Sequence, residues 1–350
     1  TPKPSSAASD VYKRQKGVAE IQLNRFSFAG LGLETKTFSE ISGTSSVIFD
    51  SPNNEWGLSF YNMNLHWNNH LLQPFYVQAS YVPSESLSLR ADQIDLAFIS
   101  QFLSEGELLS ESDGETLLGY GLSGKLENFS LLVPLQDRSD RQILLQSNIA
   151  DIEIDSVRGS PAMAGLNGYV EASFDEASSV SVGFAEIESQ GFSINLPNIF
   201  SNTWDYDRVN GRLNFRLDLN DGTKLDLASS VIFVESEAID GQVIFSLKDH
   251  REAGGERDAE IDLKVGATRA DAASKYLYLP DGPNIKQNTR STMDYLNEAI
   301  LQGDITRAGI LYRGSTLPDA ASYEKTFQSH FVLSNLSLIH ISEPTRLLSI

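Results

Sequence analysis

Residues 213–227 read LNFRLDLNDGTKLDL, and apolar and polar residues alternate on both sides of Asn220-Asp221-Gly222. Strict alternation is typical of a β-strand with one apolar face and one wet face. An Asn-Asp-Gly sequence between two such runs is a hairpin signal, because the turn needs residues that adopt positive φ without strain. The stretch therefore predicts two antiparallel strands joined by a tight turn.

The same alternation recurs along most of the chain. Strands of parallel sheets are covered on both faces and read as continuous apolar runs, so alternation favours antiparallel sheets. We therefore expect a mainly β protein, with more than about four tenths of residues 16–335 in strands against a globular norm nearer one quarter. The clearest further runs are residues 58–60, 75–81, 152–154, 180–184, 192–196, 243–247 and 261–265.

Ten apolar residues from residues 213–219, 243–247 and 261–265 are predicted to share one face of the sheet. The polar residues between the first of them, Asn214, Arg216 and Asp218, should face solvent on the other side. The ten are Leu213, Phe215, Leu217, Leu219, Val243, Phe245, Leu247, Ile261, Leu263 and Val265.

A weak repeat of the form apolar-polar-Gly-x-apolar runs through the chain. Its copies are residues 122–126, 166–170, 209–213 and 239–243. The glycine is expected to end a crossing loop and to open a new strand. On this interpretation the repeated unit is a hairpin or short meander of one extended sheet. Chance recurrence among loop glycines is the alternative.

Helices are expected to be few and short. Residues 291–302 form the best candidate, because Met293 and Leu296 fall on one apolar face, and this helix should be the longest. Residues 96–103 predict a shorter helix, and residues 113–118 predict one further turn.

Two short motifs resemble binding sites, and their context argues against both. Residues 119–124 read GYGLSG and match the dinucleotide fingerprint, but that fingerprint must follow a strand and open a helix, whereas a strand is expected after it here. His66 and His70 stand four apart, but their segment alternates like a strand and lacks the Glu of a zinc protease. We interpret the first as a loop and the second as a surface strand and turn.

Two acidic groups are also assigned to structure rather than to chemistry. Residues 218–222 begin like a calcium loop but lack its spacing and its final Glu, so a hairpin turn is favoured. Asp205 and Asp207 suggest the paired carboxylates of a glycosidase, but nothing places them across a cleft, and we expect a loop. The sequence thus gives no catalytic residue, no metal site and no cofactor site.

The chain is acidic and contains no cysteine. It carries 27 Lys+Arg against 47 Asp+Glu, for a formal net charge of -20. Such a field repels phosphate, which argues against a nucleic-acid partner and against a general electrostatic attraction to anionic membranes. The lack of cysteine removes thiol catalysis, disulfides and Cys-based metal sites. No apolar run approaches the roughly 18 residues of a membrane helix.

Both ends of the chain resemble translated library adapters. Residues 5–15 read SSAASDVYKRQ and residues 336–346 read LSLIHISEPTR, and each is one reading frame of an adapter used in transposase-based libraries. We therefore expect residues 1–15 and 336–350 not to be native and to contribute little to the core. Residues 16–335 should be an internal fragment of a protein that continues in both directions.

A succession of short elements stands near the C-terminal end of this fragment. Residues 275–280 read KYLYLP, and after the expected helix come residues 303–305, which read GDI, and residues 311–318, which read LYRGSTLP. This order resembles the YhdP family of AsmA-like envelope proteins. Tyr295-Leu296 and Leu317-Pro318 depart from the pattern, since the family usually has tryptophan-leucine and phenylalanine-proline there.

The resemblance implies both a fold and a function. Family members are anchored in the inner membrane of gram-negative bacteria by an N-terminal helix, which this fragment would lack. Their body crosses the periplasm as an extended, curved antiparallel sheet with an open apolar groove, which the ten residues named above would line. Members are implicated in moving phospholipid to the outer membrane and in keeping that membrane a barrier. The implied partners are phospholipid acyl chains and envelope proteins of both membranes, and no enzyme activity is implied.

Two other functions stay open at this point. A closed β-sandwich, serving as a binding or adhesion module of the cell envelope, would bury the same apolar faces against each other. A carbohydrate-active enzyme on a β scaffold would need paired carboxylates in a cleft. An open apolar face along the sheet favours the lipid bridge, and a sealed core favours the sandwich.

Overall fold

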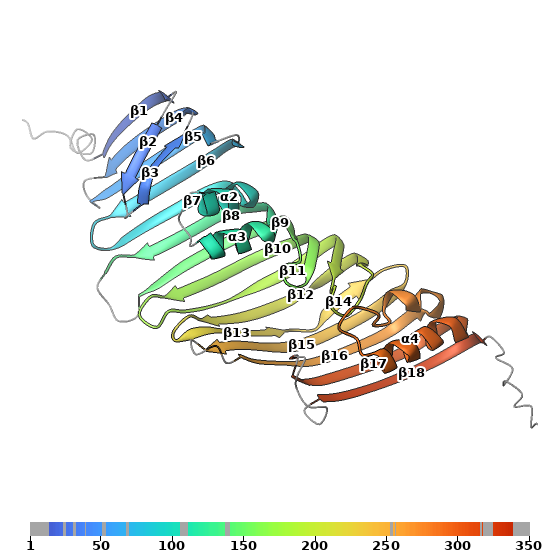
Figure 1. Cartoon of the computed structure of the whole chain (residues 1–350). Helices are drawn as coiled ribbons and strands as arrows, with labels where there is room; N and C mark the ends of the chain where they lie inside the picture. Colours follow the sequence, from blue (N-terminus) through green and yellow to red (C-terminus); the bar gives the residue numbers. More distant parts are fainter. Residues whose placement is uncertain are drawn as a thin grey trace, which may run out of the picture.

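The computed structural model describes residues 14–338, apart from residues 24–25, 31–32, 39, 51–53, 68–69, 106–110, 137–140, 253–254, 256, 316 and 318–324. Of the chain, 70% is strand, which confirms the expectation of a mainly β protein. Sixteen strands form one antiparallel sheet, and two more form a separate hairpin. The long sheet is curved, and short helices lie beside it (Figure 1).

Most strands of the long sheet follow one another in chain order. In their order across the sheet they are β1 (Arg14–Leu23), β4 (Glu40–Asp50), β5 (Glu55–Trp67), β6 (His70–Val82), β7 (Ser86–Asp95), β8 (Ser123–Pro134), β9 (Gln142–Ile154), β10 (Ala162–Asp175), β11 (Val180–Asn195), β12 (Trp204–Asp218), β13 (Gly222–Ser229), β15 (Ile239–Glu252), β16 (Arg257–Asp271), β17 (Ile300–Ser315) and β18 (Lys325–Leu338). The short β14 (Ile232–Glu235) pairs with β12 and β15. β12 and β13 pair from Leu213 to Asp218, which confirms the hairpin predicted around Asn220.

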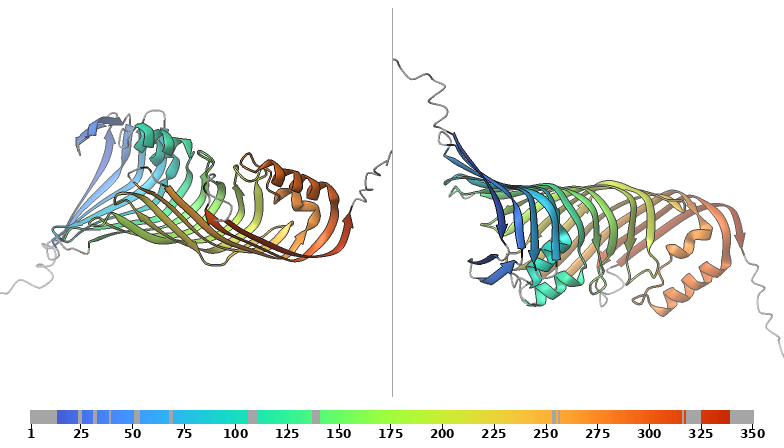
Figure 2. Two further views of the ribbon diagram at one scale, coloured as in Figure 1. Left: turned by 60° about the horizontal axis from the view of Figure 1, so that its bottom comes forward. Right: turned by 90° about the horizontal axis from the view of Figure 1, so that it is seen from above.

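The two long sides of the sheet carry different connections. We call the first side the helical rim, because its longer connections contain short helices or a hairpin. These connections include β2 (Phe26–Gly30) and β3 (Leu33–Phe38), then α2 (Leu96–Glu105) and α3 (Glu111–Gly119), and finally η1 (Ala272–Leu277) and α4 (Gln287–Ala299). At the second side, the turn rim, the connections include the short turns at residues 83–85, 176–179 and 219–221. Both views in Figure 2 place the helices along one rim of the curved sheet.

A line of β-bulges crosses the sheet near the helical rim. At each bulge, two consecutive residues are exposed, although alternation would turn one of them inward. Asn62, Asn128 and Gly191 have φ values of 50°, 52° and 73° there, a conformation that Asn and Gly adopt most readily. The exposed pairs are Tyr61/Asn62, Glu127/Asn128 and Gln190/Gly191; Asp207/Arg208 are likewise both exposed, although β12 keeps its register with β11 and β14 there.

The residues that flank each exposed pair lie on one face of the sheet. Tyr206 and Val209 flank Asp207/Arg208, are 8% and 4% exposed, and form a buried cluster with Phe192 and Val234. Burial on this side of the bend and exposure on the other side put the cluster on the inside of the curve. We call this side the inner face and the opposite side the outer face.

The repeat glycines lie inside strands, which corrects the expectation that they end crossing loops. Gly124 is in β8, Gly168 in β10, Gly211 in β12 and Gly241 in β15, so successive copies from β8 to β12 are one hairpin apart. A Cβ on Gly124 would stand 2.5 Å from the Asp151 carbonyl oxygen. The glycines are therefore explained by close approach of the neighbouring strand near the bulges, which leaves no room for a side chain.

The helices occur where the sequence predicts them, with shifted bounds. α4 covers 13 residues and is the longest of the described helices, but it begins four residues before the expected start. It ends at Ala299 because Ile300 is already extended, at ψ 111°, and opens β17. α2 and α3 confirm the two shorter helices expected in this region.

The short motifs are structural elements. The GYGLSG segment lies between α3 and β8, and residues 66 and 70 lie in β5 and β6, where Trp67 pairs with His70. Asp205 and Asp207 are part of β12, so the loop expected for them is wrong. The pairing of β12 with β11 reaches the start of the strand and includes Asp205, which makes the segment extended.

The expected adapter boundaries stay predictions. Residues 1–13 and 339–350 lie outside the described residues. β18 continues through Leu338 and so includes three residues beyond position 335, as the apolar character of residues 336–341 favours. β1 likewise starts at Arg14, two residues before the expected native start.

The segment that carries η1 and α4 folds back onto the loop between β11 and β12. The Asp281 N–H donates to the Ile199 carbonyl at 3.1 Å, and Trp204 Nε1 donates to the Leu277 carbonyl at 2.7 Å. The Asp281 carboxylate accepts from the Ser201 N–H at 2.8 Å and from Ser201 Oγ. These hydrogen bonds from Ser201 hold the pKa of Asp281 below its usual value. Two rim segments 80 residues apart are therefore joined.

Replacing Gly124 by Ala should destabilise the sheet. Its φ of +98° and the 2.5 Å approach to Asp151 leave no relaxed position for a Cβ, so we expect a loss of about 1–3 kcal/mol in the free energy of unfolding. Urea unfolding followed by circular dichroism measures this. Gly309→Ala is the matched control, because a Cβ there meets nothing within 4 Å. An equal loss in both variants would contradict the close-approach explanation.

Replacing Asp281 by Asn should lower the thermal midpoint more at neutral pH than at about pH 3. The folded-state pKa is depressed, so the carboxylate contributes stability above its unfolded-state value near 3.9 and loses it as the pH falls through the folded-state value. Thermal unfolding of both proteins at about pH 7 and about pH 3 checks this. Asp294→Asn, at an exposed position of α4, should leave both midpoints unchanged. A difference between wild type and Asp281→Asn that is the same at both pH values would show that this carboxylate does not act through its charge.

Candidate functional site: an apolar inner face

An unbroken row of apolar residues crosses the inner face at right angles to the strands. Each member is the direct cross-strand partner of the next, so all of them point to the same side of the sheet. At about 4.8 Å per strand, the row is roughly 50 Å long. Its members are Val47, Leu58, Ala79, Leu89, Leu131, Leu145, Ala172, Gly183, Phe215, Leu227, Leu247 and Ile261.

The rows on either side have the same character. Towards the helical rim, Phe60, Val77, Ala91 and Phe129 pair in sequence, and beyond them the inner face continues with Val170, Ala185, Leu213, Phe245, Leu263 and Tyr312. Towards the turn rim, the row contains Phe49, Trp56, Tyr81, Leu87 and Val133, and later Phe174, Leu217 and Leu225. The inner face is therefore a broad apolar surface and not a single stripe.

Nine of the ten residues predicted to share a face lie together on this surface. Phe215, Leu247 and Ile261 belong to the unbroken row. Val243 pairs with Val265, one step nearer the helical rim than Phe245 and Leu263. The tenth, Leu219, follows the end of β12 and is 49% exposed in the turn.

The larger part of the surface was not among the residues predicted from sequence. β4 to β11 contribute inner-face residues such as Trp56, Leu89, Leu131 and Leu145. Their alternation is visible in the sequence, but it is interrupted at the bulges. The signal that could have found them is an apolar spacing of three between two runs of spacing two, as in Leu126 and Phe129.

Serine side chains within the inner face are turned to the backbone. Ser147 is 1% exposed and its Oγ donates to the Glu127 carbonyl at 3.0 Å. Ser189 is fully buried and its Oγ accepts from the Asn167 N–H at 2.8 Å. Ser229 Oγ accepts from the Phe245 N–H at 2.8 Å. Because these hydroxyls are satisfied locally, they add little polarity to the surface.

The inner face is covered near the helical rim and open towards the turn rim. The cluster of Phe192, Tyr206, Val209 and Val234 is buried, and desolvation there raises the pKa of Tyr206. In contrast, Trp56, Tyr81 and Leu87, towards the turn rim, are 48%, 42% and 40% exposed. Among the described strands, only β2 and β3 lie outside the long sheet, so they provide no second sheet of its size. A contiguous apolar surface this large usually marks an interaction site.

The outer face carries paired charges beside scattered exposed apolar side chains such as Leu132, Leu144 and Val182. Arg212 donates to Glu186 at 3.2 Å and lies over the Phe184 ring, and His250 contacts Asp226 at 2.9 Å. Asp262 accepts from Arg313, which lowers the pKa of Asp262. Asn214, Arg216 and Asp218 pair with outer-face residues, so they lie opposite the apolar rows as expected.

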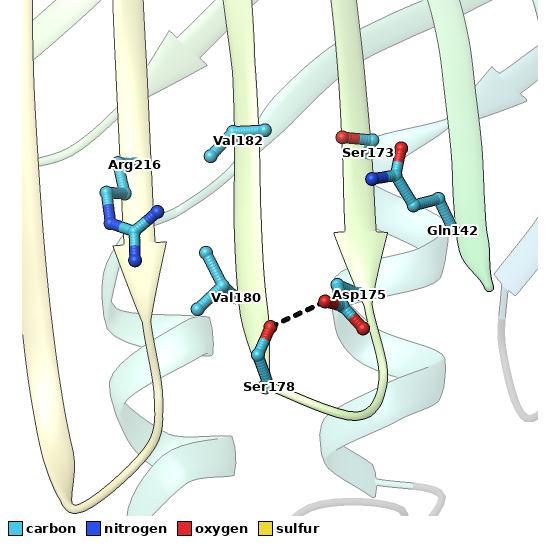
Figure 3. A pocket seen from close by; sticks show the side chains of 7 residues that line it. All are labelled: Gln142, Ser173, Asp175, Ser178, Val180, Val182 and Arg216. Atoms are coloured by element: carbon cyan, nitrogen blue, oxygen red, sulfur yellow. Dashed lines mark hydrogen bonds between the residues drawn. The ribbon is translucent and has the colours of Figure 1, made fainter. Parts of the chain in front are cut away.

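A shallow hollow of about 240 Å³ also lies on the outer face, beside the turn rim (Figure 3). Arg216, Val182 and Ser173 are cross-strand neighbours there, and Ser178 Oγ donates to Asp175 at 2.8 Å. The hollow is on the opposite side from the apolar rows, and its acidic group is already hydrogen-bonded. We therefore place the candidate site on the inner face.

One ion pair stands among the apolar side chains of the inner face. Asp249 is the cross-strand partner of Leu225 and Ala259 and so belongs to the row nearest the turn rim. Arg257 Nε and Nη2 donate to its two oxygens at 2.8 Å each. This fork lowers the pKa of Asp249 and raises the pKa of Arg257.

The described residues hold neither a cluster of three metal-ligating side chains nor a helix of the length and hydropathy that a membrane span requires. The chain has no significant match to a curated protein or to a solved structure. The model of one family, described as YhdP protein, matches residues 11–339, a range that contains every strand from β1 to β18. The chain belongs to the YhdP protein family.

Proposed function

We propose that the inner face carries the acyl chains of phospholipids. On this proposal the chain is a segment of a periplasmic bridge, anchored in the inner membrane of a gram-negative bacterium, that conducts phospholipid toward the outer membrane. The bridge supports the barrier function of that membrane. Membership in the YhdP family supports an envelope role in general.

The observation that carries the proposal is the unbroken apolar row from Val47 to Ile261. Along this surface the side chains of Val47, Trp56 and Tyr81 are exposed by two fifths or more, and a contiguous apolar surface that stays in contact with water usually marks an interaction site. Acyl chains are suitable partners, because each methylene group removed from water contributes about 0.8 kcal/mol. A stretch of ten methylenes therefore gains roughly 8 kcal/mol, before the loss of motional freedom is subtracted.

The two faces divide the tasks of such a bridge. The inner-face rows carry almost no charge. An acyl chain that moves across the sheet from one strand to the next therefore meets a similar surface at each step. The outer face carries ion pairs such as Arg313–Asp262 and stays in water. The net negative charge of the protein keeps copies from associating through their exposed apolar surfaces.

The closed β-sandwich is less well supported. A sandwich requires a second sheet about 10 Å from the first, and the described strands outside the long sheet amount to one short hairpin. A glycosidase is disfavoured because Asp205 and Asp207 lie two apart on the same strand, with no cleft between them.

Photo-crosslinking distinguishes the conduit from the sandwich. A benzophenone amino acid at Phe215 or Phe245, both on the inner face, should label phospholipid in cells that produce the full-length protein. The same group at Asn214 or Arg216, on the outer face of the same strand as Phe215, should give a background yield. Lipid is extracted with each adduct and identified by mass spectrometry.

Asn214 and Arg216 are matched controls, because they flank Phe215 on the same strand and lie on the opposite face. Equal labelling at all four, or no lipid adduct at Phe215 and Phe245, would reject the conduit. Protein adducts at the inner positions in place of lipid would favour the sandwich.

A further inference from the structure

A second group of charges lies at the end of the inner face, where β15 and β16 meet the turn rim. Alternation from Asp249 places Arg251 on the inner face, and alternation from Ala259 does the same for Arg257. The two arginines are direct cross-strand partners. They stand in a protein whose formal net charge is -20.

The pairing of these arginines is unfavourable as it stands. Like charges directly opposite each other on neighbouring strands destabilise the pair. Both oxygens of Asp249 accept from Arg257, and Arg251 acts on this carboxylate only through its charge at longer range. Among the described residues, no carboxylate lies within ion-pair distance of the exposed Arg251 guanidinium. An anion that bridges the two guanidinium groups would remove the repulsion.

The residues that follow the two arginines toward the middle of the inner face restrict the chemical class of this anion. Two residues inward along the strands are Asp249 and Ala259, and four residues inward are Leu247 and Ile261 of the unbroken row. Two residues of a strand span roughly 7 Å. A ligand that fills the site has an anionic head at the arginines and an apolar body that begins on the rows.

We propose that Arg251 and Arg257 bind the phosphodiester of a phospholipid whose acyl chains lie on the inner face. This inference rests on the function proposed above and adds a head-group site to it. A phosphodiester carries one negative charge and two free oxygens, which match the donors of two guanidinium groups better than a single point charge does. The site is a place at the groove edge where the head group stays wet while the chains leave water.

The test uses the 350-residue chain with the benzophenone amino acid at Phe245. The probes are dioleoylphosphatidylglycerol and dioleoylglycerol, which share their acyl chains and differ in the phosphodiester. Crosslinking yield against lipid concentration gives a half-saturation value for each. Arg251→Gln is the variant, because Arg251 is exposed and its replacement leaves the Asp249–Arg257 fork intact. Arg216→Gln makes the same change of charge on the outer face.

Arg251→Gln should raise the half-saturation concentration for phosphatidylglycerol about fivefold, the effect of one partly exposed ionic contact. It should leave the value for dioleoylglycerol unchanged, and Arg216→Gln should change neither. Glycerol 3-phosphate, at concentrations that saturate with the lipid, should not compete. Equal thermal midpoints of the three proteins show that folding is unaltered.

The outcomes separate this site from the function on which it rests. Labelling by both lipids with no selective effect of Arg251→Gln would overturn the head-group site and leave the conduit standing. Competition by glycerol 3-phosphate at the lipid's own half-saturation would mean that the arginines take free phosphate, and this too overturns the proposal. Absence of labelling by either lipid would overturn both proposals.

Discussion

Cross-strand register is the constraint on which the rest of the structure depends. Side chains of a strand alternate between faces, so a slip of one residue in a single strand would carry its inner-face residues to the outer face. The unbroken row from Val47 to Ile261 requires that eleven successive pairings avoid such a slip. The tight turns at one rim fix the register of hairpins such as β12–β13, and the apolar face fixes it further, because a slipped strand would expose its leucines and phenylalanines.

The bulges show how the sheet bends without losing this register. An extra residue in one strand moves every later side chain of that strand to the opposite face of the sheet. The faces are kept only where two consecutive residues both point outward. That is the arrangement at Tyr61/Asn62 and at Glu127/Asn128. Because the bulges recur at similar heights in successive strands, the part of the sheet beyond them bends as a unit towards the inner face. The bend brings Tyr206 and Val209 together in the buried cluster that they form with Phe192 and Val234 near the helical rim.

The strands were predictable from sequence because alternation is a local signal, and hairpins such as β12–β13 also carried turn chemistry. The common face of Leu213, Phe245 and Leu263 was predictable for the same reason, since no bulge interrupts those runs. The course of the bend was not, because it depends on which strands bulge at matching heights. The loop predicted at Gly124 was wrong, because glycine occurs both in loops and where two strands approach closely, and only the neighbouring strand distinguishes the two cases. Asp205 and Asp207 were assigned to a loop because nothing in the sequence places them across a cleft, although their alternation with Trp204 and Tyr206 is that of a strand.

A single curved sheet differs from a two-layer fold in how its stability is distributed and in leaving one apolar face open. In a meander of this kind each strand contacts mainly its two neighbours, so stability is close to a sum of local contributions, as in repeat proteins. In the part of the chain that the structure describes, the inner face is already open to solvent at Trp56, Tyr81 and Leu87, which are exposed to about two fifths or more of their full extent. The surface is also nearly uniform from strand to strand, which suits a ligand that moves along it better than one that is held at one place. The exception is the fork between Asp249 and Arg257, together with Arg251 at the groove edge. On the proposed function, charge at that point leaves the central row from Val47 to Ile261 continuous and acts on the head group, which stays in water, while the acyl chains lie on the apolar rows.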